Sequence, residues 1–131
     1  MKIFGIGTDI VNIKRLDKSI KIYGKNFKNK IFSQNEINYC ETKKYSSSFY
    51  AKRFAAKEAF TKALGTGIRK NINFKNIEIF NDRYGKPFIK IKGGVRDFLK
   101  KKVKNKKYNI YLSLSDDKPW AQATVIISYN K

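Results

Sequence analysis

The sequence has no histidine, one cysteine and few acidic residues. Without histidine, catalytic triads and metal sites built on imidazole are excluded, and zinc is disfavoured. Any metal ion would have to be held by oxygen atoms, which favours Mg²⁺ or another hard cation. The single Cys40 allows no disulfide within the chain, and neither a signal peptide nor a long apolar run is visible. We therefore expect a cytoplasmic protein that does not enter the membrane.

The scarcity of acidic residues leaves a large excess of positive charge. Lys and Arg number 30 against 10 Asp and Glu, which gives a net charge of +20 over 131 residues. Such a surface attracts nucleic acid, anionic membranes, phosphorylated ligands or acidic proteins, and charge alone favours nucleic-acid binding. However, the basic residues are spread along the whole chain and match no standard nucleic-acid-binding motif. At this length we expect one domain, residues 1–131, which gains stability from oligomerisation.

The chain from Phe49 to Leu64 predicts a long helix, because no Gly or Pro interrupts it. Gly65 follows where a helix needs a left-handed cap residue. Small and apolar residues recur at three- and four-residue spacing on one face: Ala51, Phe54, Ala55, Ala59 and Ala63. Glu58 and Lys62 lie four residues apart on another face, a pattern typical of an exposed ion pair worth about 0.2–0.5 kcal/mol.

A second stretch near the start of the chain changes the interpretation of that pair. Residues 5–11 read Gly5-Ile6-Gly7-Thr8-Asp9-Ile10-Val11 and predict a strand whose glycines permit close approach of another backbone or of a ligand. The third glycine of a dinucleotide fingerprint is missing, so no Rossmann unit is expected. Asp9 and Glu58 together would supply two carboxylates for a hard cation, and the ammonium group of Lys62 would meet a phosphate.

The remaining segments predict a mixture of helices and antiparallel strands. Besides the long helix, we expect helices over residues 14–23, 33–43 and 95–104. We expect strands over residues 2–11, 77–80, 87–91, 108–115 and 120–129. Gly24 should end the first helix, residues 27–32 should form a link and residues 71–76 a polar loop. A capping box at Ser33–Glu36 should start the second helix, and the serines at 46–48 should cap the long one. This pattern predicts an α+β fold, with an antiparallel sheet packed on a long central helix.

Two of these stretches, in this order and spacing, closely resemble a known family. Gly5–Val11 and Arg53–Gly67 resemble the two signature motifs of holo-[acyl-carrier-protein] synthase, the short type of 4'-phosphopantetheinyl transferase. Asn81–Pro87 and the strand pair around Ser113–Ser115 fit as well, so the resemblance covers nearly the whole chain. It implies the 4'-phosphopantetheinyl transferase fold in one domain, and a homotrimer with an active site at each subunit interface.

The resemblance also implies a reaction. The 4'-phosphopantetheine group of coenzyme A moves to a serine of an apo acyl carrier protein, which serves fatty acid biosynthesis, and adenosine 3',5'-bisphosphate is released. Asp9 and Glu58 would hold Mg²⁺, and Lys62 would bind the transferring or leaving phosphate. Glu58, directly or through a water on the metal, would accept the proton of the serine. The alternative, a basic nucleic-acid-binding protein without catalytic activity, would have no need of Asp9 and Glu58.

Further contacts are implied by the resemblance. The residues expected at coenzyme A are Lys44, Arg53, Lys62, Gly65, Gly85, Lys86 and Pro87, with Lys44 and Arg53 on the 3'-phosphate. The residues expected at the acidic carrier protein are Lys14, Arg15, Lys18 and Lys21, where opposite charge would speed association. Asp116 departs from the family, because many relatives carry histidine there. An aspartate would repel a phosphate unless a Lys or Arg pairs with it.

Overall fold

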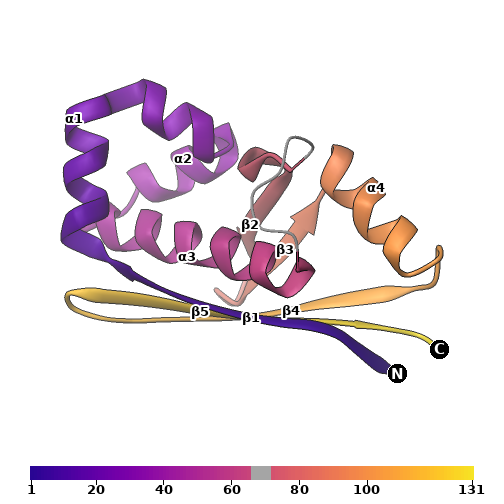
Figure 1. The fold of residues 1–131 in the computed structure, drawn as a ribbon. Coiled ribbons are helices and arrows are strands. Elements are labelled where there is room, and N and C mark those ends of the chain that lie inside the picture. Colours follow the sequence, from indigo (N-terminus) through magenta and orange to yellow (C-terminus); the bar gives the residue numbers. More distant parts are fainter. Residues whose placement is uncertain (66–71) are drawn as a thin grey trace.

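The computed structural model describes residues 1–65 and 72–131, and it contains both helices and strands (Figure 1). In chain order they are β1 (Lys2–Asn12), α1 (Ile13–Ile31), α2 (Gln34–Glu41), α3 (Ser46–Leu64), the 3-10 helix η1 (Phe74–Asn76), β2 (Ile77–Asn81), β3 (Pro87–Ile91), α4 (Gly93–Lys102), β4 (Tyr108–Asp117) and β5 (Trp120–Tyr129). The α+β class and the long central helix are confirmed. Thr66 and Gly67 of the helix motif, and Asn71 of the expected loop, lie outside the described residues.

The strands form two antiparallel sheets. β1, β5 and β4 make a three-stranded sheet in that order, and β2 and β3 make a separate hairpin. Figure 1 shows the helices on one face of the larger sheet, with α3 running along it, while no element formed by residues 1–65 and 72–131 covers the other face. Along β1, Asp9 lies opposite Ala123 of β5. No helix within residues 1–65 and 72–131 is long and apolar enough to cross a bilayer.

Helix α3 packs tightly on β1 because β1 carries glycines at the contact. A Cβ atom on Gly5 would collide with the carbonyl oxygen of Ala63, and one on Gly7 with the carbonyl oxygen of Ala59. The expected close approach of another backbone is therefore confirmed, and the small residues of α3 supply its other side. This packing fixes β1 along the helix that carries Glu58 and Lys62.

The first helix differs from the prediction. Gly24 interrupts the helix where the sequence predicted, with a non-helical φ of 58° and ψ of −138°, but a second helical stretch follows this kink and runs as far as Ile31. The expected link at 27–32 is therefore wrong for all but its last residue. The continuation packs Phe27 and Ile31 against the core, which explains why it remains helical after the kink.

Of the two N-terminal caps predicted for α2 and α3, the first is confirmed and the second is wrong. The capping box is confirmed, since Ser33 Oγ accepts from the Glu36 backbone N–H and the Glu36 carboxylate accepts from the Ser33 N–H. The serines do not cap α3, because its N-cap is Tyr45 and makes no side-chain cap bond. Ser48 instead donates its hydroxyl to the Tyr45 carbonyl at 3.0 Å. At the other end Gly65 is the expected left-handed cap, with φ 85°.

One buried ion pair joins α3 to the elements beside it. Lys57 Nζ lies 2.7 Å from Glu36 Oε1, and both side chains are fully buried. Lys57 also donates to the carbonyl oxygens of Phe74 and Ile77, and the other Glu36 oxygen accepts from the Ile79 N–H. The pair therefore ties α3 to the start of α2, to η1 and to β2.

Candidate active site

Strand β1 brings Asp9 to Lys62 on α3. Lys62 Nζ lies 3.1 Å from Asp9 Oδ1 and donates to the Thr8 carbonyl at 2.9 Å. The ion pair that the spacing suggested, between Glu58 and Lys62, is not among the salt bridges of the described residues. A partner from 53 residues earlier in the chain takes its place.

Glu58 and Asp9 line one cavity of about 500 Å³ between β1, α1 and α3. Arg15 of α1 also lines it, so a residue expected at the carrier protein lies beside those expected at the metal. The apolar part of the lining comes from Leu16, Phe27 and Phe54. The cavity thus combines two carboxylates and a guanidinium group with an apolar wall.

The two carboxylates of the cavity repel each other, and this repulsion affects the pKa of Glu58. Burial raises the pKa of Glu58 above its ordinary value, the neighbouring Asp9 charge raises it further, and Lys62 opposes both. A carboxyl group with a raised pKa is better suited to accept a proton near neutral pH. A bound cation would relieve the repulsion between the two carboxylates.

The side chains present fit a hard cation that shares its ligands with a substrate. No group of three or more His, Cys, Asp or Glu that could hold a metal occurs within residues 1–65 and 72–131. The site therefore offers two carboxylates, and Mg²⁺ characteristically takes one or two carboxylates and completes its shell with phosphate oxygens and water. Asp9 and Glu58 match that donor set.

The residues expected on coenzyme A do not line this cavity. Lys44 is exposed, and its Nζ lies 5.6 Å from the centre of the Tyr45 ring. Gly85, with φ 87°, is part of the exposed turn between β2 and β3 that also holds Lys86. Pro87 begins β3. Within one chain, Lys62 therefore lies at the carboxylates, whereas Lys44 and the residues of the β2–β3 turn do not line their cavity.

Arg53 is buried rather than exposed to a ligand. Only 2% of the residue is accessible, and its guanidinium carbon lies 4.2 Å from the centre of the Tyr39 ring. It donates to Asn81 Oδ1 at 2.6 Å, and Asn81 in turn donates to the Gly85 carbonyl. Arg53 thus stabilises the β2–β3 turn through its hydrogen bond to Asn81.

The basic residues expected at the carrier protein lie on the exposed side of α1. Lys14, Arg15, Lys18 and Lys21 are all exposed. Lys21 forms an exposed ion pair with Asp17 at 3.0 Å, four residues away. Asp116, which departs from the family pattern, is paired with Lys52 of α3 at 3.1 Å. A basic partner therefore compensates its charge.

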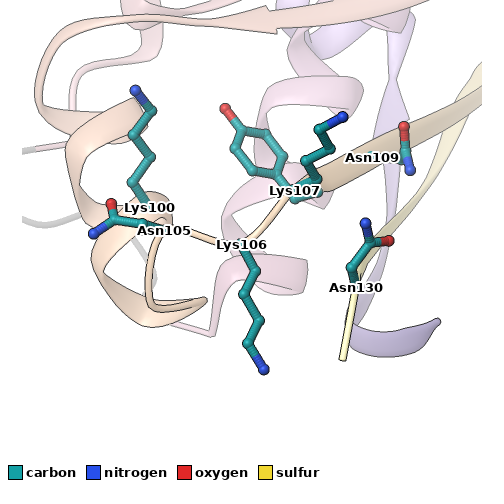
Figure 2. Close-up of a pocket in the computed structure, with 7 residues that line it drawn as sticks. Lys100, Asn105, Lys106, Lys107, Asn109 and Asn130 are labelled. Carbon is teal, nitrogen blue, oxygen red and sulfur yellow. The ribbon is translucent and has the colours of Figure 1, made fainter.

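Another cleft, which is basic, lies at the other end of the larger sheet (Figure 2). It has a volume of about 490 Å³, and no carboxylate is among its lining residues, which include Lys100, Lys106 and Lys107. Lys100 and Lys106 point in opposite directions in Figure 2, so these ammonium groups do not converge on one point. This cleft lacks the acid pair and is not the candidate active site.

Two structural features, the position of Phe27 and the burial of Lys57, were not predicted from the sequence. Phe27 lines the cavity although the sequence pattern assigned it to a link, because a second helical stretch follows the kink at Gly24. Lys57 is fully buried, although it neighbours Glu58 and has the same side chain as the exposed Lys62. No local pattern distinguishes these two lysines.

Comparison with known proteins decides the family. Residues 5–124 match the 4'-phosphopantetheinyl transferase superfamily. The chain belongs to this superfamily. It is 46% identical over 127 residues to the holo-[acyl-carrier-protein] synthase of Pelagibacter ubique, covering 97% of this chain and 98% of that one. It is 47% identical over 130 residues to the holo-[acyl-carrier-protein] synthase of Wolbachia pipientis, covering 95% of this chain and 97% of that one.

Solved structures of this superfamily share the fold over almost their whole length. The crystal structure of the holo-[acyl-carrier-protein] synthase of Neisseria meningitidis matches with a TM-score of 0.85 and 37% identity, covering 98% of this chain and 99% of that one. The synthase of Bacillus anthracis in complex with CoA (3',5'-ADP) matches with a TM-score of 0.80 and 34% identity over all of both chains. The resemblance inferred from the motifs is confirmed.

Proposed function

We propose that this protein transfers the 4'-phosphopantetheine group of coenzyme A to a serine of an apo acyl carrier protein. The products are holo acyl carrier protein, for fatty acid biosynthesis, and adenosine 3',5'-bisphosphate. The observation that carries the proposal is the convergence of Asp9, Glu58 and Lys62 beside one cavity. The alternative, a nucleic-acid-binding protein without activity, has no support among the relatives, which are synthases over nearly their full length.

The chemistry is attack by a hydroxyl group on a pyrophosphate phosphorus, so most of the catalytic work is positioning and neutralising charge. Asp9 and Glu58 would hold Mg²⁺, which when bound neutralises the oxygens of the pyrophosphate. The Lys62 side chain is 55% exposed and donates hydrogen bonds to the Thr8 carbonyl and to Asp9. A phosphate oxygen can replace either acceptor, so Lys62 is placed to bind the transferring or leaving phosphate.

Glu58, directly or through a water on the metal, is the proposed acceptor of the serine proton. Without a bound cation, burial and the charge of Asp9 raise the pKa of Glu58, and a cation held by the same carboxylate would counteract that shift. The apolar wall of the cavity, formed by Leu16, Phe27 and Phe54, would keep bulk water from the attacking oxygen. Exclusion of water favours transfer to serine over hydrolysis.

A homotrimer with active sites between subunits is part of the proposal. The uncovered face of the larger sheet exposes large apolar side chains, including Ile6 at 61% and Ile10 at 62%. Tyr111 and Trp120 are also large exposed residues on this sheet. Association between subunits would bury this surface. It would also explain why the residues expected on coenzyme A, among them Lys44 and Gly85, lie apart from the cavity of their own chain.

The carrier protein is proposed to dock on α1. Its exposed basic side chains adjoin the cavity through Arg15, so an acidic helix bound there would present its serine close to Glu58. A cytoplasmic location, where carrier proteins and coenzyme A meet, completes the proposal.

The direct test is intact-mass spectrometry of an apo acyl carrier protein incubated with this protein, coenzyme A and Mg²⁺. We expect the carrier protein to gain the mass of one phosphopantetheine, and we expect EDTA to block the gain. A carrier protein whose serine is replaced by alanine is the control and should gain nothing. Unchanged mass with several carrier proteins, from a folded sample, would overturn the proposed function.

A further inference from the structure

The end of α4 and the loop that leads to β4 carry a dense group of lysines. Six of the eight residues from 100 to 107 are lysine, and neither Asp nor Glu occurs between residues 98 and 115. We call residues 100–107 the basic tip. Figure 1 places it at the opposite end of the molecule from α1, where the carrier protein is proposed to dock. All of its lysines are exposed: Lys100, Lys101, Lys102, Lys104, Lys106 and Lys107.

No carboxylate of the protein neutralises the basic tip. Every salt bridge within residues 1–65 and 72–131 lies elsewhere, and none involves a lysine of the tip. Lys102 Nζ lies 5.5 Å from the centre of the Phe98 ring, a contact that leaves its charge in place. The ammonium groups therefore repel one another, and an external polyanion would relieve this repulsion.

The fold accounts for only part of this charge. The lysines at 100–102 lie in the last turn of α4, where they meet the negative end of the helix dipole. The dipole acts within about one turn, so it does not explain Lys106 and Lys107. Lys104 is locally unfavourable, because its φ of 55° lies in the left-handed region where glycine is the ordinary residue. A function of the lysine charge would explain this local cost.

The geometry of the basic tip favours an extended anionic surface over a single anion. Lys100 and Lys106 point in opposite directions in Figure 2. The lysines at 100–102 fan out around α4, because successive helical residues turn by about 100°. Such ammonium groups do not converge on one phosphate. A layer of lipid headgroups offers many anions that move laterally, so each flexible lysine can meet one of its own.

Other polyanions fit the basic tip less well. Single-stranded nucleic acid is typically held by aromatic side chains on which its bases stack, but Phe98 and Tyr108, which flank the tip, are both half-buried. Arginine, which binds a fixed phosphate through two parallel hydrogen bonds, is absent from the tip. An acidic protein presents fixed carboxylates, and divergent ammonium groups match a fixed pattern poorly.

We propose that the basic tip binds an anionic membrane surface by electrostatic attraction, without entering the bilayer. Each lysine close to such a surface strengthens binding about fivefold, which corresponds to about 1 kcal/mol. Val103, the apolar residue of the tip, is 2% accessible, so the tip contacts headgroups rather than acyl chains. The surface is independent of the proposed function, because its cleft shares no residue with the cavity of Asp9 and Glu58.

The test is co-sedimentation with vesicles made of equal parts of phosphatidylglycerol and phosphatidylcholine. At about 0.15 M salt, where charges are screened beyond about 8 Å, we expect the unaltered protein to bind these vesicles and not vesicles of phosphatidylcholine alone. Replacing three lysines together, Lys104→Gln, Lys106→Gln and Lys107→Gln, should reduce the partition coefficient on the order of 100-fold. The circular dichroism spectrum should not change, because all three side chains are exposed.

The matched control removes the same charge from exposed lysines outside the tip, with Lys25→Gln, Lys30→Gln and Lys90→Gln together. We expect it to weaken vesicle binding far less. An equal loss in both triple variants would show that net charge alone is responsible and would overturn the inference. A folded unaltered protein that does not bind the anionic vesicles would overturn it too.

Two further measurements separate this inference from its alternatives. Binding of a single-stranded RNA that is tighter than vesicle binding, and that the tip variant loses, would overturn the choice of a membrane as the partner. Phosphopantetheine transfer to a carrier protein without vesicles reads the proposed function by itself. The tip variant should transfer at the unaltered rate, and a large loss of that rate would overturn the separation of the tip from the candidate active site.

Discussion

Two lysines on α3, five residues apart, show how differently one helix can use the same side chain. Lys57 is fully buried, lies 2.7 Å from Glu36 and donates to two backbone carbonyl oxygens. Lys62 has a side chain that is 55% exposed and lies 3.1 Å from Asp9 at the candidate site. Both form an ion pair with an acid from another element.

The difference between these pairs lies in what surrounds them. Burial lowers the pKa of Lys57, and the charge of Glu36 opposes that shift, so the ammonium group depends on its fixed partner. Lys62 is in contact with water and can exchange its partners for a phosphate at small cost. An ion pair with every donor satisfied inside the protein orients the helix, whereas one left open to solvent is available for chemistry.

The largest expected effect comes from removing the buried lysine. Lys57→Met would leave the Glu36 carboxylate without its cation and two carbonyl oxygens without a donor, which should lower the free energy of unfolding by about 3–5 kcal/mol. Lys62→Met should lower it by less than about 1 kcal/mol, because exposed pairs contribute little. Urea denaturation followed by circular dichroism measures both. Equal losses would contradict the contrast between the two lysines.

For catalytic activity we expect the opposite order, with the larger loss in Lys62→Met and the smaller in Lys57→Met. Lys62→Met should reduce kcat by about 10²–10³, the usual effect of losing a group that stabilises developing charge. Lys57→Met, assayed at low temperature and corrected for the folded fraction, should retain most of its kcat. The mass gain of the carrier protein over time gives both rates. Normal turnover by folded Lys62→Met would remove Lys62 from the site.

A smaller effect is expected at the docking surface. Reversing charge at Arg15 and Lys18 should raise the KM for the carrier protein several-fold and flatten its dependence on salt, because electrostatic steering is lost. The control reverses Lys106 and Lys107, which line the basic cleft at the other end of the larger sheet (Figure 2). If the control variants raised KM as much as the α1 variants, docking would follow net charge rather than position.

The smallest effect concerns stability and pH at Glu58. Because its pKa is raised in the folded protein, the folded state binds the proton more tightly than the unfolded chain. This contribution favours folding below the ordinary pKa of glutamate and is lost as pH rises through the raised one. Glu58→Gln should therefore have a slightly higher melting temperature than the unaltered protein at pH 7, in the absence of Mg²⁺, and little advantage at pH 4. A lower melting temperature at pH 7 would contradict the assignment.

Local patterns in the sequence predicted a large part of this architecture. Gly65 as a cap, the capping box at Ser33–Glu36 and the glycine contact of β1 with α3 all follow from short-range stereochemistry. Gly24 breaks the helix as these rules predict, but they did not show that a second helical stretch, which packs Phe27 against the core, follows the kink.

Long-range ion pairs were outside the reach of spacing rules, although the family resemblance had already grouped Asp9 with Glu58 and Lys62. The spacing of Glu58 and Lys62 favoured a local ion pair, but the fold supplies Asp9 to Lys62 from β1. Lys57 and Glu36 are 21 residues apart, and Lys118 reaches the Tyr45 ring from a distant turn. Such partners depend on tertiary structure, which no spacing rule encodes.

The most direct test of this account is the Mg²⁺ dependence of phosphopantetheine transfer in the unaltered protein and in Asp9→Asn. The rate of carrier-protein mass gain is measured over a series of Mg²⁺ concentrations with coenzyme A in excess. The account predicts that transfer by the unaltered protein saturates with Mg²⁺ and stops with EDTA, while folded Asp9→Asn requires far more Mg²⁺ or gives no transfer. Transfer that resists EDTA, or an unchanged Mg²⁺ midpoint in Asp9→Asn, would contradict it.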